Sequence, residues 1–315
     1  MSTATGSTSH SETRGRPNGV TAARAPLTER ILAYTLLTPA ALLVVAFVVA
    51  PLVIVIGLAF FKVNLIAGTA AFVGLDNFAA ETTNPEFLTS LGNTLMYGLL
   101  TVIPSIVLGL AFAVTINSLT RGQGFWRAVY FMPVATTLVA MSAVWRWLFR
   151  ADTGIVDQIL SPLGLHNWLG DPNLALGAVA VVGNWHQIGL VTILYLAALG
   201  TLPRDQYESA TLDGAGAWNR FFHVTWPGLG PTTVFAFILC CSSALQAYDV
   251  IAAMTQGGPL GSTETLTYAI WLRGVNYFDI GRASVLSITL LGLSVVVTMI
   301  QRSRAVQRLE QAGTR

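Results

Sequence analysis

The stretch ESATLDGAGAWNRFFHVTWPGL, residues 208–229, separates two long apolar segments and decides how the rest of the chain is interpreted. Residues 205–217, around its start, begin with residues that favour helix, continue through Gly214 and Gly216, and have Pro203 before them and Pro227 after them. Glycine ends or bends a helix, and proline limits where a helix can continue. The pattern therefore predicts a short helix, a turn and a second helical piece. The stretch holds no group of residues typical of an active site.

The composition on both sides of this stretch is that of an integral membrane protein. Of the 315 residues, 53% are hydrophobic and only 10% are charged, whereas soluble domains carry about 25% charged residues. The net charge of +2 and the lack of nucleic-acid-binding motifs argue against nucleic acid as a partner. The chain has no phosphate-binding P-loop and no metal-ligand spacing. Any ATP must therefore be bound by another polypeptide.

Six charge-poor segments are long enough to cross a membrane, which takes about 20 residues each. We therefore predict an all-α, polytopic membrane protein with six transmembrane helices. Residues 1–30 are expected to form a disordered N-terminal tail, and residues 302–315 a C-terminal tail. The run at 265–272 is too short to cross. The expected spans are 31–61, 87–120, 128–145, 172–203, a fifth that starts near residue 231 and continues past Asp249, and 283–301.

The distribution of basic residues predicts the orientation of these spans. If both termini are cytoplasmic, 12 of the 17 Lys and Arg residues lie in inner segments and the other 5 in outer segments. Cytoplasmic loops carry the excess of basic residues in membrane proteins. This orientation places residues 203–229 in the cytoplasm.

Two interpretations of the cytoplasmic segment fit its residues. Its small residues leave a low surface that another protein can approach, and Trp218, Phe221 and Phe222 can act as apolar anchors. The segment would then be a docking element. Amphipathic pieces that merely lie on the membrane surface have a similar composition. The residues alone leave both interpretations open.

The segment resembles the cytoplasmic loop of the membrane subunits of bacterial binding-protein-dependent ABC importers. That pattern reads E-A-A, three residues, G, nine residues, I, one residue, L-P. Here Ser209 replaces the second small residue and Trp226 replaces Leu, without changing the spacing. The positions that match in place are Glu208, Ser209, Ala210, Gly214, Val224 and Pro227.

The similarity continues downstream of the loop. TQGGP at 255–259, followed by TETLTYAIW and DIGRASVLS, looks like the C-terminal part of carbohydrate-uptake permeases of the maltose and glycerol-3-phosphate type. The resemblance implies a type I ABC importer permease fold in the bacterial inner membrane, with residues 31–301 as the permease domain. It also implies that the loop is a coupling helix that docks on a separate ATPase. The coupling residues so implied are Glu208, Ser209, Ala210, Gly214, Ala215 and Pro227.

The resemblance further implies which partners the chain has and that the chain itself is not catalytic. The partners would be a second homologous permease subunit, two ATPase subunits and an extracytoplasmic solute-binding protein. The chain would bind no cofactor, since ATP and Mg²⁺ would belong to the ATPase. The solute would be a small polyhydroxylated or phosphorylated molecule, either a neutral sugar or an anion such as glycerol-3-phosphate.

Polar and aromatic residues inside the expected spans are candidates for the solute path, because such residues are costly in lipid. Hydrogen bonding between neighbouring helices is an equally open explanation. For Asp249 we expect a partner such as Arg146 or Arg273. Trp145, Trp147 and Trp168 are expected at the membrane interface. The candidate path residues are Asn184, Trp185, His186, Gln187, Gln246, Tyr248 and Asp249.

Two other classes of function remain as alternatives. A secondary transporter driven by an ion gradient could use Asp249 and His186 as a proton relay, although inverted repeats are not evident. A membrane-embedded enzyme would need a catalytic constellation, which the sequence does not offer at convincing spacing.

Overall fold

The computed structural model describes the backbone of residues 27–64 and 67–313. The chain divides into two compact units, with the boundary between Leu52 and Val53. Most of the expected 1–30 tail lies outside the described residues, and the first helix already begins at Leu27. At the other end, residues 302–313 continue the last helix.

The first unit holds the start of an apolar helix that runs through α1 (Leu27–Val44), η1 (Val45–Val49) and α2 (Ala50–Leu58). Thr35–Leu58 is long and apolar enough to cross a membrane. The π-helical turn of η1 ends two residues before Pro51, which has no N–H to donate to the preceding turn. From residue 35 to residue 52 every side chain is exposed. The apolar side chains of residues 35–52 are therefore not covered by other parts of the first unit.

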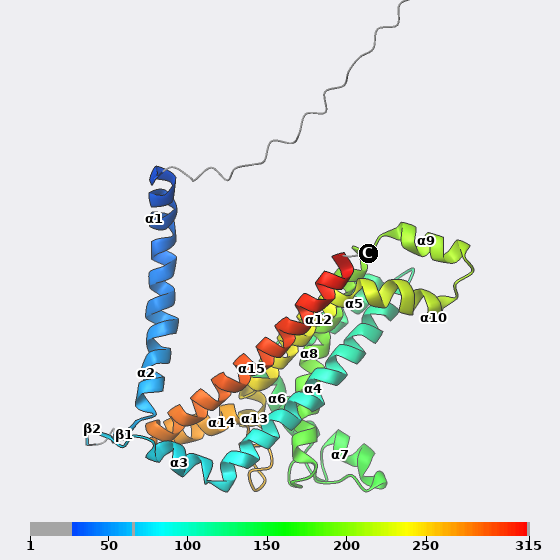
Figure 1. The fold of residues 1–315 in the computed structure, drawn as a ribbon. Helices are drawn as coiled ribbons and strands as arrows, with labels where there is room; N and C mark the ends of the chain where they lie inside the picture. The colour runs from blue at the N-terminus through cyan, green and yellow to red at the C-terminus, as the bar shows by residue number, and fades with distance from the viewer. Residues whose placement is uncertain (1–26, 65–66, 314–315) are drawn as a thin grey trace, which may run out of the picture. The chain divides into compact units, whose positions relative to one another are not determined.

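The second unit is built on long helices that run side by side (Figure 1). They are α4 (Pro85–Ser118), α8 (Ala175–Leu199), α12 (Gly230–Leu245) and α15 (Ile280–Gly313). The α4 helix packs on α8 and α12, and α12 also packs on α15. At Gly109 of α4, a Cβ atom would lie 2.6 Å from Cγ1 of Val191 in α8. Small residues of this kind let membrane helices approach closely.

Two of the expected spans are broken helices. The α5 helix (Gln123–Ala135) and α6 (Leu138–Leu148) meet at an angle of 98°. The expected span over residues 128–145 is therefore not one straight helix but falls on two helices that meet at a sharp bend. Pro133 removes a donor near the end of α5, and Thr136 has extended backbone. Within the described part of the chain, four helices can cross a membrane alone, or up to six if each bent pair is one span.

The fifth expected span also differs from its prediction. The α10 helix (Ala217–Arg220), η3 (Phe221–Thr225) and α11 (Trp226–Gly228) lead into α12 with a bend of 65°. The α12 helix then ends at Leu245, and a separate helix, α13 (Asp249–Met254), begins after three intervening residues. The span therefore does not continue past Asp249.

Short elements gather at one end of the second unit, opposite α9 (Arg204–Leu212) (Figure 1). The strands β1 (Phe61–Asn64) and β2 (Thr69–Phe72) form an antiparallel hairpin in which Phe61 pairs with Phe72. As expected, the run at 265–272 is too short to cross. The other short elements are α3 (Asp76–Thr82), α7 (Ile155–Leu160), η2 (Ser161–Leu163), α14 (Leu266–Trp271) and η4 (Leu272–Asn276).

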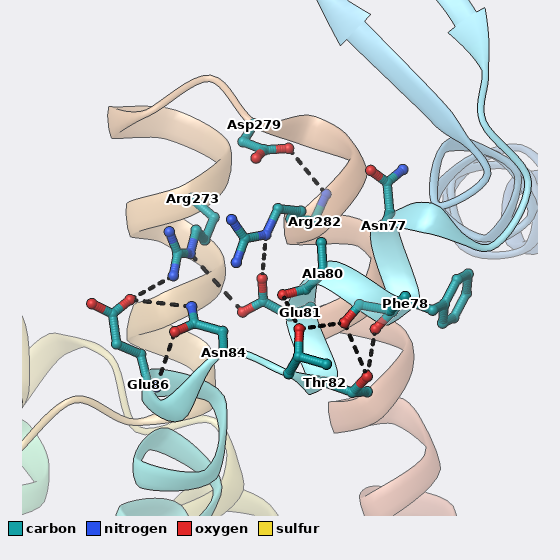
Figure 2. Close-up of polar contacts among 12 residues, drawn as sticks. Asn77, Phe78, Ala80, Glu81, Thr82, Asn84, Glu86, Arg273, Asp279 and Arg282 are labelled. Atoms are coloured by element: carbon teal, nitrogen blue, oxygen red, sulfur yellow. Dashed lines mark hydrogen bonds and ion pairs between the residues drawn. The ribbon is translucent and has the colours of Figure 1, made fainter.

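A network of charges, which we call the charged network, holds this end together (Figure 2). The Glu81 carboxylate is only 1% exposed. Its Oε2 lies 2.6 Å from Nε of Arg282, and its Oε1 lies 4.0 Å from Nε of Arg273. Arg273 also pairs with Glu86 at 2.6 Å. The network joins α3 and the start of α4 to η4 and α15, so its members come from opposite ends of the sequence.

Candidate functional site

The expected coupling segment forms a projecting element, residues 204–228, which we call the knob (Figure 1). The α9 helix starts after Pro203 and ends at Leu212, and Gly214 follows with φ of +76°. This left-handed conformation is costly for residues that carry a Cβ. The Ala215 amide donates to the Ala210 carbonyl at 2.9 Å, which closes the end of the helix. The predicted order of helix, turn and second helical piece is confirmed.

The residues of the expected coupling set lie at different depths in the knob. Glu208, Ser209 and Gly214 are exposed, whereas Ala210 and Ala215 are half-buried. Pro227 is exposed as well, but it stands in α11 at the base of the knob. The structure thus groups the first five residues on α9 and its turn and leaves Pro227 apart.

Two large apolar side chains of the knob are strongly exposed. Leu212 is 88% exposed and Trp218 is 75% exposed. The Trp218 ring stacks on Phe222, with ring centroids 5.8 Å apart. The sequence pattern singled out the aromatic residues but missed Leu212, whose signal is an apolar residue at the end of an otherwise polar helix. Exposed apolar groups of this kind mark contact surfaces.

Two side-chain hydrogen bonds brace α9 against the rest of the knob. The hydroxyls of Tyr207 and Thr225 lie 2.9 Å apart. Nη1 of Arg220 donates to Oγ1 of Thr211 at 3.1 Å. These contacts tie the first helix to the second helical piece, which leads into α12.

Within the long helices, Asn184 of the candidate path bonds to α4. Its Nδ2 donates to the Leu100 carbonyl at 2.8 Å, and its Oδ1 accepts from Oγ of Ser105 at 2.9 Å. Both ends of the side chain are thereby satisfied by a neighbouring helix. This geometry favours the helix-packing explanation for Asn184.

Trp185 ends a row of aromatic rings, which we call the aromatic row. The row passes from Trp168 to Phe149, Trp145 and Trp185, with neighbouring centroids 5.7, 5.8 and 6.0 Å apart. Trp145 and Trp168 pack against the hydrophobic core, and Trp147 is 52% exposed. The interface-belt expectation therefore does not fit Trp145 and Trp168. The row leads from the loop before α8 to the middle of α8.

His186 and Gln187 follow Trp185 and have unused hydrogen-bonding capacity. His186 is half-buried. Gln187 is 8% exposed, and its Oε1 has no hydrogen-bond partner among the described residues. A buried acceptor without a partner is costly. These two side chains are therefore better candidates for solute contact than Asn184.

The remaining candidates lie around the break after α12. The Tyr248 ring contacts the rings of Tyr268 and Trp271 at 6.0 and 5.8 Å. Gln246 is exposed and donates to Oγ of Ser242 at 3.2 Å. Asp249 is exposed at the start of α13.

The arginine partners expected for Asp249 are engaged elsewhere. Arg146 donates to the Ala253 carbonyl at 3.5 Å, and Arg273 pairs with Glu86 in the charged network. No ion pair of Asp249 occurs among the residues that the structure describes. Its exposure at the helix start accounts for a carboxylate at this position, since negative charge is favourable there.

A second buried carboxylate organises the loop between α6 and α8. Asp157 is 1% exposed and accepts hydrogen bonds from the amides of Asp152 and Asn167 and from Nδ1 of His166. Burial raises the pKa of Asp157, but these hydrogen bonds outweigh it, so the net pKa lies below its ordinary value. The ligand atoms of Asp152, Asp157 and His166 lie within 4.8 Å of one another. Their hydrogen bonds assign them a role in shaping the loop.

Comparison with families of known proteins gives a match over residues 105–305. The matching model is that of the family described as binding-protein-dependent transport system inner membrane component. The matched residues run from within α4 to within α15 and include the knob.

Individual relatives extend the similarity over most of the chain. The chain is 35% identical to the sulfoquinovosyl glycerol transport system permease protein SmoG of Agrobacterium fabrum, over 87% of this chain and 90% of the relative. It is 31% identical to the trehalose/maltose transport system permease protein MalF of Thermococcus litoralis, over 80% and 85%. It is 30% identical to the sn-glycerol-3-phosphate transport system permease protein UgpA of Agrobacterium fabrum, over 86% and 94%.

Solved structures share the fold. A crystal structure of a bacterial ABC transporter involved in the import of the acidic polysaccharide alginate contains a chain that superposes with a TM-score of 0.76. The sequence identity is 20%, and the match covers 89% of this chain and 96% of that one. At this identity the likeness establishes the architecture alone.

Proposed function

The chain belongs to the family of binding-protein-dependent transport system inner membrane components, and we propose that it forms half of the translocation path of an ATP-driven importer. It is a translocation subunit and not an enzyme. A second, homologous permease subunit supplies the other half of the path. Two ATPase subunits bind ATP and Mg²⁺, and a solute-binding protein delivers the solute from outside.

The knob is the observation that carries this proposal. It presents exposed apolar side chains, Leu212 and Trp218, on a short helix that is braced by hydrogen bonds to the base of α12. A membrane-surface segment would instead direct its apolar side chains toward one plane and would need no bracing. A braced helix with apolar anchors is suited to dock in a groove of a partner.

The same geometry supplies the coupling step. When ATP binding draws the two ATPase subunits together, α9 moves with the groove that holds it. The contacts between Tyr207 and Thr225 and between Arg220 and Thr211 transmit the movement to η3 and α12. The bend of 65° between the knob and α12 makes the knob a lever arm. The spans then rotate, and the path opens outward to receive solute.

The orientation follows from the basic residues. With both termini in the cytoplasm, the inner segments hold 12 of the 17 Lys and Arg residues. The knob then faces the ATPases. The charged network and the loop organised by Asp157 face outward, where the binding protein docks.

We propose a sugar or a glycerol-3-phosphate-like molecule as the solute. The relatives are named for sulfoquinovosyl glycerol, for trehalose and maltose, and for sn-glycerol-3-phosphate. Hydroxylated solutes need hydrogen-bond partners and flat apolar faces, and His186 and Gln187 with the ring of Trp185 are candidates to provide both. Family membership gives no support to a transporter driven by an ion gradient.

A matched pair of glycine variants tests the coupling role. Gly214→Val and Gly216→Val both introduce side chains into open space, but φ is +76° at Gly214 and −66° at Gly216. Only the first is strained, so it should distort the turn after α9. We expect Gly214→Val to abolish solute uptake into proteoliposomes that hold the complete complex, with solute capture by the binding protein unchanged.

Gly216→Val should retain uptake, because valine tolerates extended backbone. Glu208→Ala, which removes an exposed charge from α9, should reduce uptake in the same assay. Full uptake by both Gly214→Val and Glu208→Ala would refute the coupling role of the knob.

A further inference from the structure

A pocket of about 520 Å³ lies behind the knob, between α9 and the ends of α4 and α8. We call it the knob pocket. Its walls come from the last turns of α4 and α8, from the inner face of α9, and from α10 and η3. Its volume is within the range of about 300–1,000 Å³ that small-molecule sites occupy. The surface that docks on the ATPase is the opposite, exposed face of α9.

The polar lining of the knob pocket is positively charged. Arg204 and Arg220 both line it, together with the hydroxyls of Tyr207 and Thr225. Among the described residues around the pocket, none that lines it is acidic. The two guanidinium groups carry two positive charges. The C-terminal ends of α4 and α8 offset roughly half a charge each, so about one positive charge remains in the pocket.

Much of the hydrogen-bonding capacity in the pocket is unused. Arg220 donates once, to Thr211, out of five N–H groups. The Arg204 guanidinium has no hydrogen bond or ion pair to the part of the chain that the structure describes, and it stands at the start of α9, where positive charge is unfavourable. An arginine that only neutralised a helix end would bond to the carbonyls there. The opposite wall is apolar, with Val114, Leu199 and Phe221.

We propose that the knob pocket binds a phosphate group carried on an apolar or uncharged body. Two arginine forks match the oxygens of a phosphate, and the apolar wall accommodates the body. The phosphate comes either from a soluble phosphate ester or from the headgroup of a lipid in the adjoining leaflet. A ligand held between α9 and the ends of α4 and α8 restrains the movement of α9. The assignment to the cytoplasmic face rests on the proposed function.

Protection of a cysteine from labelling tests the proposal in the complete complex. Asn117→Cys places a thiol at the exposed edge of the pocket, and Thr115→Cys places one just outside it. The complex is held in lipid nanodiscs, which expose both faces, and the rate of reaction with a maleimide is measured. The slow reaction of Cys240 and Cys241 is subtracted with the unmodified chain. One arm adds inorganic phosphate to phosphatidylcholine discs, and the other uses discs that contain phosphatidylglycerol.

We expect protection at position 117 and not at position 115. With a Kd of about 1 mM, phosphate at about 10 mM would fill roughly nine-tenths of the pockets and slow labelling about tenfold. Protection by free phosphate identifies a soluble ester as the source, and protection by phosphatidylglycerol alone identifies the lipid. Arg204→Gln should remove the protection. Arg121→Gln, an exposed arginine on the same side, should leave it intact.

Two results would overturn the proposal. The first is unchanged labelling in both arms, and the second is protection that persists in Arg204→Gln. ATP hydrolysis and uptake by the same complex test the permease function separately. Normal uptake without protection would refute phosphate binding in the knob pocket and leave the permease function standing. Protection in a complex that cannot transport would refute the permease function and leave phosphate binding standing.

Discussion

The two ends of the second unit use their polar and apolar residues in opposite ways. In the charged network, Glu81 is buried and is shared by Arg273 and Arg282. In the knob, Trp218 and Leu212 are exposed, and Glu208 is exposed as well. At one end the charged groups are paired within the chain, and at the other apolar and charged groups stay exposed.

This difference separates residues that maintain the fold from residues that, in the proposed function, serve assembly. A buried ion pair that loses one member leaves a charge without compensation. Removal of an exposed apolar side chain changes the stability of the fold little, because that side chain makes few contacts within it. Substitutions at the two ends should therefore fail in different assays, and the following predictions run from the largest expected effect to the smallest.

Glu81→Gln should produce the largest loss of stability. The substitution leaves the half-buried Arg282 beside a neutral amide, which should cost about 3 kcal/mol, the lower end of the range for breaking a buried pair. Thermal unfolding of the detergent-solubilised complex measures the effect. Glu86→Gln is the matched control, because the Glu86 side chain is 66% exposed and such pairs contribute about 0–1 kcal/mol. Equal losses in the two variants would mean that burial does not distinguish the two carboxylates.

Trp218→Ala should leave unfolding unchanged and weaken the contact with the ATPase. Removal of an aromatic anchor costs about 2 kcal/mol at an interface, or roughly 30-fold in affinity. Binding of purified ATPase subunits to the permease in nanodiscs measures it. Leu163→Ala, which truncates a side chain that is 73% exposed at the opposite end, should not alter ATPase binding. A similar loss with Leu163→Ala would indicate a nonspecific effect.

Ser105→Ala should have an intermediate effect on the helices between the two ends. It removes the donor to Oδ1 of Asn184, and hydrogen bonds between membrane helices contribute about 0.6–2 kcal/mol. Unfolding of the solubilised complex measures the loss. Ser287→Ala serves as control, because its hydroxyl bonds to a carbonyl of its own helix. If the control is equally destabilised, the bond between α4 and α8 has no special role.

Asp157→Asn should have the smallest effect on unfolding of the complex as a whole, because its hydrogen bonds lie within the loop between α6 and α8, and it should change the acid response of that loop. The folded pKa of Asp157 is lowered, so its stabilisation is complete above the ordinary value of about 3.9 and is lost as pH falls through the folded pKa. Hydrogen exchange of residues 150–167 at decreasing pH measures it. The variant should lack this acid-dependent step, whereas Asp152→Asn, with an 84% exposed side chain, should keep it. Identical profiles in wild type and Asp157→Asn would contradict the assignment.

The sequence predicted the parts of the fold that depend on local patterns. Glycines and prolines defined the knob, because Gly214 needs a backbone conformation that other residues avoid and Pro203 precedes the start of α9. The length of the charge-poor segments indicated where the long helices lie. Both signals are contained within about 30 residues, so no knowledge of tertiary contacts was needed.

The parts that depend on distant contacts were not predicted. The break at Thr136 and the end of α12 at Leu245 lie inside apolar runs, where composition does not change. The pairing of Glu81 with Arg282 joins residues 201 positions apart. For the same reason Asn184 could not be distinguished from Gln187, although one is bonded to α4 and the other has an unpaired oxygen.

The aromatic row gives the molecule an intrinsic optical signal. Trp145 and Trp185 lie on different helices, at 6.0 Å and with ring planes 64° apart. At this separation the electronic transitions of two indoles couple and produce a signed pair of bands in near-ultraviolet circular dichroism. A rotation of α6 against α8 changes the angle and hence the bands. The transport cycle can therefore be followed without an attached dye, and loss of the signal in Trp145→Phe would assign it.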